Sequence, residues 1–216
     1  MGKSSRIAGE GGLRADAERN RQRLLSAARA VFAEHGIDAP MATVARRAEV
    51  GVATLYRRFP TRDDLVWAAF AEQLESCARA LTGALADPDP WRGLQRLFET
   101  VCALQRESRG FPAAFAAALP AASRAHARIQ EETERDLLAL VRRAQAAGAL
   151  RADFHPSDLT VALVAHCGLV TALPGDAAAS RRLVAYLLQS FRAEAAREPL
   201  PAPSGLSLRS FPRAAP

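Results

Sequence analysis

The stretch DAPMATVARRAEVGVATLYRRFPTRDDL, residues 38–65, decides the fold of this chain. Its apolar residues recur at helical spacing and predict one short helix over residues 41–48 and a second over residues 52–59. Only residues 49–51 separate the two. Two short helices joined by about three residues form a helix-turn-helix, whose second helix can enter the major groove of DNA.

The side chains of this stretch separate into a core-facing set and an outward-facing set. The apolar positions expected to face the core are Val44, Ala45, Val50, Leu55 and Phe59. The second helix is then expected to point small or basic side chains outward, namely Val52, Ala53, Thr54, Arg57 and Arg58. Small side chains and arginines suit close approach to base edges and phosphates.

The net charge of the 216-residue chain, +6, is concentrated around this stretch. Residues 1–62 hold twelve Lys or Arg against six Asp or Glu, and the remaining residues hold seventeen of each kind. A basic region joined to a neutral one is the expected footprint of a protein that binds a polyanion. Surface charge placed by chance is the alternative.

Further helices flank the helix-turn-helix. One is predicted over residues 16–35, ended by Gly36 in a left-handed conformation. Another opens at Thr61, where Asp64 completes a capping box, and continues for about twenty residues. Pro and Asp residues at 87–90 then indicate a domain boundary. The predicted division is a flexible arm over residues 1–15, a DNA-binding domain with its connecting helix over 16–81, a helical domain over 82–197 and a disordered tail over 198–216.

The second domain is predicted to be helical throughout, which makes the whole chain all-α. Its expected helices cover residues 91–108, 121–147, 156–173 and 176–195, with a short apolar segment over 111–119. The helix over 156–173 is apolar on nearly all sides, so it must be buried.

A two-fold dimer would bury this helix if each subunit gave its last two helices to a four-helix bundle. A monomer with a large core is the alternative. The side chains expected at the dimer interface are Leu163, Cys167, Leu183, Val184, Leu187, Leu188 and Phe191.

Several classes of protein are disfavoured by what the sequence lacks. No run approaches the ~20 apolar residues of a membrane span, and the N-terminus lacks the apolar middle of a secretion signal. We find no Gly-rich phosphate loop, no Cys-x-x-Cys pair and no His-Glu-x-x-His, so we expect no enzymatic activity, metal or cofactor. The three cysteines lie far apart in apolar helices, as buried thiols in a reducing compartment do. We therefore expect a cytoplasmic protein without a membrane partner.

Residues 21–74 resemble the tetracycline-repressor (TetR) family. The motifs that carry the resemblance are, in order, LLSAA at 24–28, FAEHG at 32–36, VARRA at 44–48, TLYRRF at 54–59 and TRDDL at 61–65. The rest of the chain agrees with the family only in length and helical layout. The resemblance implies a homodimeric transcription regulator, most often a repressor, that binds an inverted-repeat operator in double-stranded DNA and responds to a small-molecule effector.

By the same resemblance, Tyr56 at the end of the recognition helix and Arg62, in place of the usual lysine, are expected to contact phosphates. The base-facing positions of the family fall on Val52, Ala53, Thr54 and Arg57. The complete set of expected DNA-binding residues is Arg46, Arg47, Gly51, Val52, Ala53, Thr54, Tyr56, Arg57, Arg58 and Arg62. A core aromatic is the alternative for Tyr56, and solvated charge is the alternative for Arg46 and Arg47.

Three positions depart from the family pattern. Pro40 stands where a Ser or Thr often caps the helix and touches a phosphate, so that contact is expected to be missing. Glu49 stands where the turn often has Gly, and its negative charge is unfavourable near DNA unless it points away. Gly51 replaces a common Ser cap at a small cost.

The effector site carries no motif in the sequence. The candidates for lining a pocket in the second domain are Phe98, Cys102, Phe115, His126 and His166. For the two histidines the alternative is a hydrogen-bonded core side chain, and for Cys102 it is simple apolar burial. The alternative function is a helical adaptor that binds proteins through its apolar helices and DNA without sequence preference.

Overall fold

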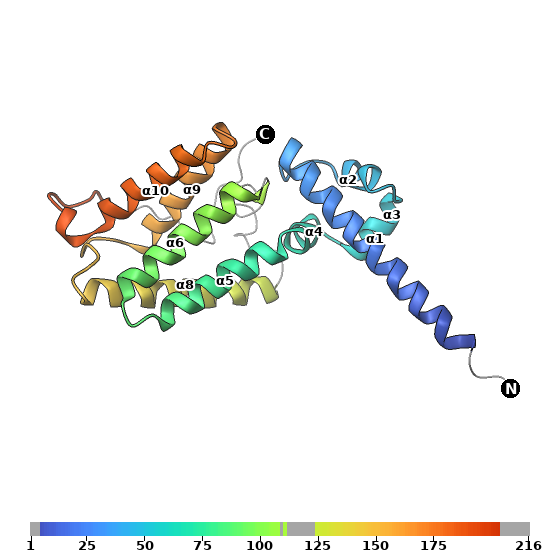
Figure 1. The fold of residues 1–216 in the computed structure, drawn as a ribbon, viewed down its shortest axis with the longest axis horizontal. Helices are drawn as coiled ribbons and strands as arrows, with labels where there is room; N and C mark the ends of the chain where they lie inside the picture. The colour runs from blue at the N-terminus through green and yellow to red at the C-terminus, as the bar shows by residue number, and fades with distance from the viewer. Residues whose placement is uncertain (1–4, 109, 112–123, 204–216) are drawn as a thin grey trace. The chain divides into compact units, whose positions relative to one another are not determined.

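The computed structural model describes residues 5–108, 110–111 and 124–203, and the side chains of residues 17–108, 110–111 and 128–203. The regular secondary structure of these residues is helical, apart from one antiparallel bridge between Leu150 and Arg192. It folds as two compact units, residues 1–69 and 70–216, whose helices are drawn in Figure 1. The all-α prediction is confirmed.

The N-terminal unit contains α1 (Ser5–His35), α2 (Met41–Arg47), α3 (Val52–Arg58) and α4 (Arg62–Ala69). Gly36 follows α1 with φ of 77°, the left-handed conformation that a glycine adopts at low cost. At the start of α4 the Thr61 amide donates to Asp64 Oδ2 (3.1 Å) and the Asp64 amide donates to Thr61 Oγ1 (3.1 Å). This reciprocal pair is the predicted capping box.

The core of this unit is formed by the helix faces that the sequence predicted. Its buried side chains include Leu24, Ala28, Val31, Phe32, Val44, Ala45, Leu55, Phe59, Leu65 and Val66. Val50, which lies in the connection between the two helices and was also expected to face the core, is half-buried. The helix-turn-helix is therefore held by apolar side chains on the faces of α2 and α3 that turn toward α1 and α4.

Helix α1 begins at Ser5, which corrects the prediction of a flexible arm over residues 1–15. The predicted arm contains Gly9, Gly11 and Gly12, which disfavour a helix. The following part of α1, however, is anchored in the core from Leu24 onward. Once a helix is nucleated, each added residue gains a backbone hydrogen bond without a new nucleation cost. Propagation from the anchored part therefore extends α1 toward the N-terminus.

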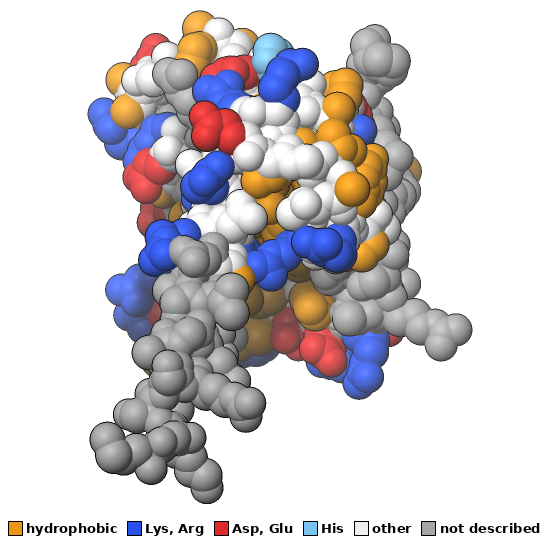
Figure 2. All heavy atoms as spheres, turned by 90° about the vertical axis from the view of Figure 1, so that its right-hand side faces the viewer, with side chains coloured by type: hydrophobic (Ala, Val, Ile, Leu, Met, Phe, Trp, Pro, Cys, Tyr) orange, Lys and Arg blue, Asp and Glu red, His pale blue; other side chains and the backbone are white. Residues whose placement is uncertain are grey.

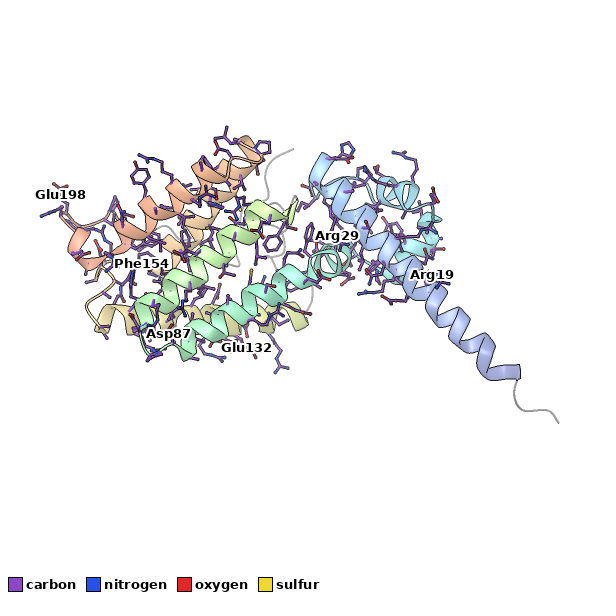
Figure 3. The ribbon with its side chains drawn as sticks, in the orientation of Figure 1. Arg19, Arg29, Asp87, Glu132, Phe154 and Glu198 are labelled. Carbon is purple, nitrogen blue, oxygen red and sulfur yellow. The ribbon has the colours of Figure 1, made fainter. Side chains whose placement is uncertain are left out.

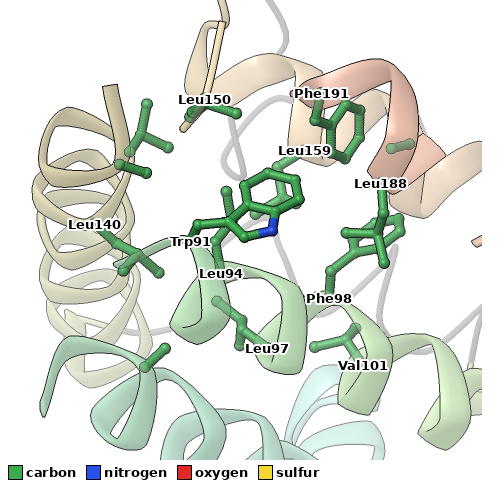
Figure 4. Close-up of a cluster of buried hydrophobic side chains, with 14 of the residues drawn as sticks. Trp91, Leu94, Leu97, Phe98, Val101, Leu140, Leu150, Leu159, Leu188 and Phe191 are labelled. Atoms are coloured by element: carbon green, nitrogen blue, oxygen red, sulfur yellow. The ribbon is translucent and has the colours of Figure 1, made fainter. Parts of the chain in front are cut away.

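The second unit contains α5 (Ala71–Ala86), α6 (Pro90–Glu107), α8 (Arg124–Ala146), α9 (Pro156–Ala172), α10 (Ala177–Phe191) and the short 3-10 helix η1 (Ala193–Ala195). Figure 4 shows part of its apolar core, where Trp91, Phe98 and Val101 of α6 lie among side chains of the neighbouring helices. Helix α8 ends before Gly148, whose φ of 67° again provides the left-handed residue that closes a helix.

Two predictions about the domain boundary are corrected. The single helix predicted from Thr61 breaks at Phe70, where the backbone has φ of −115° and ψ of 21°. Ala69 on one side of the break accepts a hydrogen bond from Arg29 Nη1 (2.9 Å), and Phe70 on the other side is buried against Phe111 at 5.9 Å between ring centroids. The two residues thus belong to different units, and the units divide here.

The residues at 87–90, predicted to be the boundary, form a tight corner inside the second unit. The Asp89 carboxylate accepts from the amides of Trp91 and Arg92 and so caps α6, with Pro90 in the first turn. Asp87 accepts from Arg92 Nη2 at 2.6 Å, and Arg143 donates to the carbonyls of residues 85 and 87. Proline and aspartate mark a helix start here, since both are favoured in the first turn or cap.

The segment after η1 is attached to the second unit, which corrects the predicted tail at its first residues. Arg151 is 8% exposed, and its guanidinium donates to the Asp153 carboxylate and to the Glu198 carbonyl. The Leu200 amide donates to Asp153 Oδ2 at 2.8 Å. A buried guanidinium requires several acceptors, and this segment supplies one of them.

Candidate nucleic-acid interface and effector region

Helix α3 is anchored by one face and exposed on the other. Leu55 is 0% exposed, whereas Val52 is 42% and Tyr56 46% exposed. The other exposed predicted DNA contacts in this region are Arg46, Arg47, Gly51, Ala53, Arg57 and Arg58, and Thr54 is half-buried. Tyr56 is therefore a surface side chain, and the alternative of a core aromatic does not hold.

Helix α1 is hydrogen-bonded to α3 and to the end of α2. At the C-terminal end of α3, Arg58 Nη2 donates to the Ala17 carbonyl at 2.9 Å. Before α3 begins, Arg23 Nη2 donates to the carbonyl of Ala48, the C-cap of α2, at 2.8 Å. These contacts, together with buried Leu55, fix the direction in which the exposed face of α3 points. A fixed direction is what a recognition helix needs.

Two of the predicted phosphate contacts are ion-paired within the chain. Arg62 Nη1 lies 3.1 Å from Asp38 Oδ1. Arg47 donates to Glu34, and this hydrogen bond raises the pKa of Arg47 and lowers the pKa of Glu34. Exposed ion pairs contribute little stability because water and salt screen them. Each arginine can therefore exchange its carboxylate for a phosphate oxygen at small cost.

The three departures from the family pattern lie before α2 and in the connection between α2 and α3. Pro40 precedes α2, and no side chain caps that helix. Gly51 precedes α3 in an extended conformation, so it needs no special backbone freedom. Glu49 has φ of 56°, the left-handed region in which a glycine is normally found. Its carboxylate lies 3.6 Å from Arg23 Nη2.

Basic side chains are spread over the N-terminal unit. Figure 2 turns this unit toward the viewer and shows Lys and Arg side chains with acidic side chains among them. The excess positive charge of residues 1–62 thus lies on the unit that contains α3. This charge attracts a polyanion.

The second unit contains a buried polar network inside its apolar core. His166 is 0% exposed, and its Nδ1 lies 2.7 Å from Gln105 Oε1 and its Nε2 2.8 Å from Ser180 Oγ. An amide oxygen can only accept, so Nδ1 carries the proton and Nε2 accepts from the Ser180 hydroxyl. Burial, with Arg106 nearby, lowers the pKa of His166. The ring is therefore neutral and connects α6, α9 and α10.

The other predicted pocket residues are placed as follows. Phe98 packs edge-on against Phe191, with 5.7 Å between ring centroids. Cys102 is buried, and burial raises the pKa of its thiol, as it raises the pKa of Cys167 to about 12. Phe115 and the side chain of His126 lie outside the described residues. The sequence reasoning missed Gln105 and Ser180, although Gln105 lies one turn after Val101 on the inward face of α6.

The predicted dimer-interface residues are mostly inside the protomer. Leu163, Val184, Leu188 and Phe191 are buried in the core of the second unit, so this part of the prediction is corrected. Cys167, Leu183 and Leu187 are half-buried. Exposed instead are Val161, Val164, Ala165 and Gly168 on α9 and Tyr186 on α10. Helical periodicity shows which residues share a side of α9 or α10. It does not show which side packs against the protomer's own core, because that depends on the positions of α6 and α8.

Within the part of the chain that the structure describes, no helix is long and apolar enough to cross a membrane. No group of three or more His, Cys, Asp or Glu side chains in the same part of the chain lies close enough to hold a metal ion.

The exposed α3, the short connection before it and the surrounding arginines define a helix-turn-helix unit of the DNA-binding class. Comparison with known families agrees. Residues 24–69 match the family of "Bacterial regulatory proteins, tetR family", and residues 89–193 match "Transcriptional regulator SbtR-like, C-terminal domain".

The chain is also similar to solved structures of other regulators. The TetR transcriptional regulator SCO0520 from Streptomyces coelicolor is 30% identical over 80% of this chain and 98% of its own, with a TM-score of 0.49. The ketosteroid transcriptional regulator KstR2 of Mycobacterium tuberculosis is 17% identical over 81% and 95%, with a TM-score of 0.61. RolR, solved with resorcinol, is 22% identical over 88% and 99%, with a TM-score of 0.50. No curated protein matches.

The chain belongs to the TetR family of transcriptional regulators. Proteins of this family are regulators that bind operator DNA, respond to small molecules and act as dimers. The predicted family and the predicted class of function are confirmed.

Proposed function

We propose that this protein represses transcription as a homodimer that reads an inverted-repeat operator with α3 and releases it when a small molecule binds the second unit. The observation that carries the proposal is the division of α3, in which Leu55 is fully buried while Val52 and Tyr56 are exposed. A short helix anchored in this way can enter a major groove without losing its contact with the core.

The side chains around the exposed face of α3 make two kinds of contact with DNA, one with bases and one with phosphates. Val52, Ala53, Thr54 and Arg57 lie at base-reading positions. Val52 and Ala53 offer methyl groups for thymine, and Arg57 can donate two hydrogen bonds to guanine. Tyr56, Arg58 and Arg62 contact phosphates, with Arg46 and Arg47 as further basic contacts.

A second copy of the chain covers the exposed apolar stripe of α9 and α10. Val161, Val164, Ala165 and Gly168 follow the helical period along one side of α9, and Tyr186 is exposed on α10. Small residues in the stripe allow two helices to approach closely. Two recognition helices related by a two-fold axis then read half-sites about 34–36 Å apart.

The effector is a small, mostly apolar molecule with one hydroxyl or carbonyl group. The Gln105–His166–Ser180 network joins α6, α9 and α10 within the mostly apolar core of the second unit, and its members use one another as partners. An effector group that replaces one partner would shift these helices. The shift changes the DNA-binding state only if the effector binds one conformation more tightly than the other. The break at Phe70, between α4 and α5, is the joint through which it acts.

Selection from a random duplex library tests this function. The purified full-length chain is incubated with the library, bound DNA is amplified over several rounds, and affinities are measured by fluorescence anisotropy. We expect an inverted repeat, bound at least about a thousandfold more tightly than scrambled DNA. Salt-dependent binding without an enriched motif would support the adaptor alternative instead, and no binding to any duplex would overturn both.

The enriched duplex then serves as the probe for the effector. Small apolar phenols, ketones and carboxylic acids are screened for release of the labelled duplex and for a rise in the melting temperature of the protein. Release with a matching rise in melting temperature supports an effector site in the folded chain. A compound that stabilises the protein but leaves DNA affinity unchanged is not its effector.

A further inference from the structure

The connection between α2 and α3 forms one side of an open hollow of about 400 Å³. We call it the turn hollow, and its lining residues are Arg19, Asn20, Arg23, Glu49 and Val50. Three of these side chains come from α1 and two from the connection. Figure 3 labels Arg19 on α1. Two guanidinium groups and an amide thus surround a space beside the residues that lead into the recognition helix.

Arg23 is the central side chain of the turn hollow. One of its terminal nitrogens donates to the Ala48 carbonyl at 2.8 Å, and the same nitrogen lies 3.6 Å from Glu49 Oε2. A guanidinium has five N–H donors, so these two contacts leave donors for a further anionic oxygen. The Glu49 carboxylate is 85% exposed, so its pairing with Arg23 is solvated and weak.

The backbone at Glu49 is unusual as well. Its φ of 56° is left-handed, and among the described residues all other positive φ values belong to glycines. A glutamate in this conformation costs more than a glycine would. The connection therefore keeps a carboxylate beside Arg23 at a position where backbone preference alone would select glycine.

The turn hollow adjoins the part of the unit that meets DNA. The start of a recognition helix inserts into the major groove, and phosphates flank that groove on both sides. Glu49 and Val50 are separated from α3 only by Gly51, and α1 contacts the end of α2 through Arg23 and the end of α3 through Arg58. A phosphate flanking the groove would therefore meet the turn hollow when α3 docks.

We propose that the turn hollow receives a DNA backbone phosphate, bound by Arg23 together with Arg19, and that the Glu49 carboxylate competes with this phosphate for Arg23. The inference rests on the proposed function, because it requires α3 to dock in a major groove. A phosphate carries no base identity, so the contact adds affinity for every sequence alike. Glu49 reduces that contribution and leaves a larger share of the affinity to the base contacts of α3.

A double-mutant cycle measures this competition. Glu49→Gln, Arg23→Gln and the double variant are titrated by anisotropy with the selected operator and with a scrambled duplex, from 50 to 200 mM salt, values chosen to span roughly the range in which phosphate contacts weaken. The matched control is Glu75→Gln, since Glu75 is an exposed carboxylate paired with Arg79 at 3.7 Å on α5. All four proteins are checked for native helix content and melting temperature.

We expect Glu49→Gln to raise affinity for both duplexes about three- to tenfold, and Glu75→Gln to change it less than about twofold. Arg23→Gln should weaken both and reduce the salt slope by about 0.9, the value for one phosphate contact. In the Arg23→Gln background, Glu49→Gln should have no more effect than the control.

Each part of the inference has its own contradicting result. An unchanged salt slope in Arg23→Gln would overturn the phosphate contact. A substitution that only distorts the turn weakens binding but releases no fewer counterions, so it leaves the slope unchanged. An equal gain from Glu49→Gln with and without Arg23 would overturn the competition. If Arg23→Gln does not fold, Arg19→Gln replaces it, and it should reduce the salt slope in the same way, whereas an unchanged slope would again overturn the phosphate contact. Failure of the wild-type protein to bind any duplex would instead overturn the proposed function.

Discussion

Gly93 on α6 packs directly against the Ala84 carbonyl of α5, so closely that a Cβ atom on Gly93 would lie 2.5 Å from the carbonyl oxygen. The neighbouring Ala84 backbone atoms would lie at 3.1 and 3.2 Å. Backbone atoms cannot rotate away as a side chain can. We therefore expect Gly93→Ala to force α5 and α6 apart and to lower the free energy of unfolding by about 2–3 kcal/mol, measured by urea denaturation.

Gly83, in the last turn of α5, is the matched control for this prediction. A Cβ atom at Gly83 has nothing within 4 Å, and the residue is exposed. Gly83→Ala should therefore raise the free energy of unfolding by about 0.5–1 kcal/mol through helix propensity alone. A stabilising or neutral Gly93→Ala would show that the two helices are free to separate.

The fold of the N-terminal unit was predictable because its signals are local. Gly36 ends α1, Thr61 and Asp64 cap α4, and the apolar spacing of α2 and α3 needs no knowledge of distant residues. The division at Phe70 was not predictable in this way. It depends on a contact with Phe111, which lies 41 positions further along the chain (111 minus 70), and helical periodicity does not stop there.

The left-handed conformation of Glu49 gives a second prediction about stability. Glycine avoids most of the steric cost of about 1–2 kcal/mol that other residues meet there, although its greater freedom in the unfolded chain offsets part of the gain. Thermal and urea denaturation should show Glu49→Gly to be about 0.5–1 kcal/mol more stable than the wild type. Glu49→Gln keeps the same backbone cost and should stay within about 0.5 kcal/mol of the wild type.

Two neighbouring residues of α3 are expected to affect DNA binding differently. Arg57→Ala should cost about 1–3 kcal/mol on the operator and relax the preference at one base pair, because a base edge loses its partner. Tyr56→Phe removes only a hydroxyl and should weaken all sequences alike by about tenfold or less. Binding selections repeated with each variant show whether the preferred motif changes. If Tyr56→Phe alters the motif while Arg57→Ala does not, the two roles are reversed.

We expect the free energy of unfolding to depend on pH because of the buried His166. Burial lowers its pKa, so the folded chain keeps the ring neutral while the unfolded chain takes up a proton below about 6.5. The stabilising effect of a neutral ring is complete above that value and is lost as the pH falls below it, at no more than about 1.4 kcal/mol per pH unit for one proton.

Urea denaturation at pH 7.5, 6.5 and 5.5 measures this dependence. His166→Gln should flatten it, although the variant is less stable at pH 7.5 because the contacts to Gln105 and Ser180 change. His35→Gln, at an exposed position, should retain the wild-type dependence. An unchanged pH dependence in His166→Gln would mean that another group controls it.

The candidate sites were predictable to different degrees. The DNA-binding face of α3 followed from spacing, since one buried Leu55 determines which neighbours are exposed on a single turn. The network around His166 did not, because Gln105, His166 and Ser180 come from three helices whose contact depends on tertiary structure. The side of α9 that faces solvent was likewise undetermined, since nearly every side of that helix is apolar.

The exposed stripe of α9 gives the last prediction, which concerns the dimer. Val164 is 38% exposed in the middle of the stripe, so Val164→Glu places a charge in the proposed interface without disturbing the protomer core. Size-exclusion chromatography with light scattering should show the wild type at twice the chain mass of 23.1 kDa and Val164→Glu near the chain mass itself. Operator affinity should fall at least about a hundredfold, because each half-site is then bound alone.

Two controls separate the interface from the core. Ile129→Glu introduces the same charge at an apolar residue of α8 that is 49% exposed, and it should remain dimeric. Leu188→Ala removes a buried side chain, so it should lower the free energy of unfolding by about 2–4 kcal/mol without separating the subunits at low temperature. If Val164→Glu stays dimeric and Leu188→Ala dissociates, the interface lies on the opposite side of these helices. That result would restore the assignment of Leu188 to the interface, and it would require the protomer to open before it dimerises.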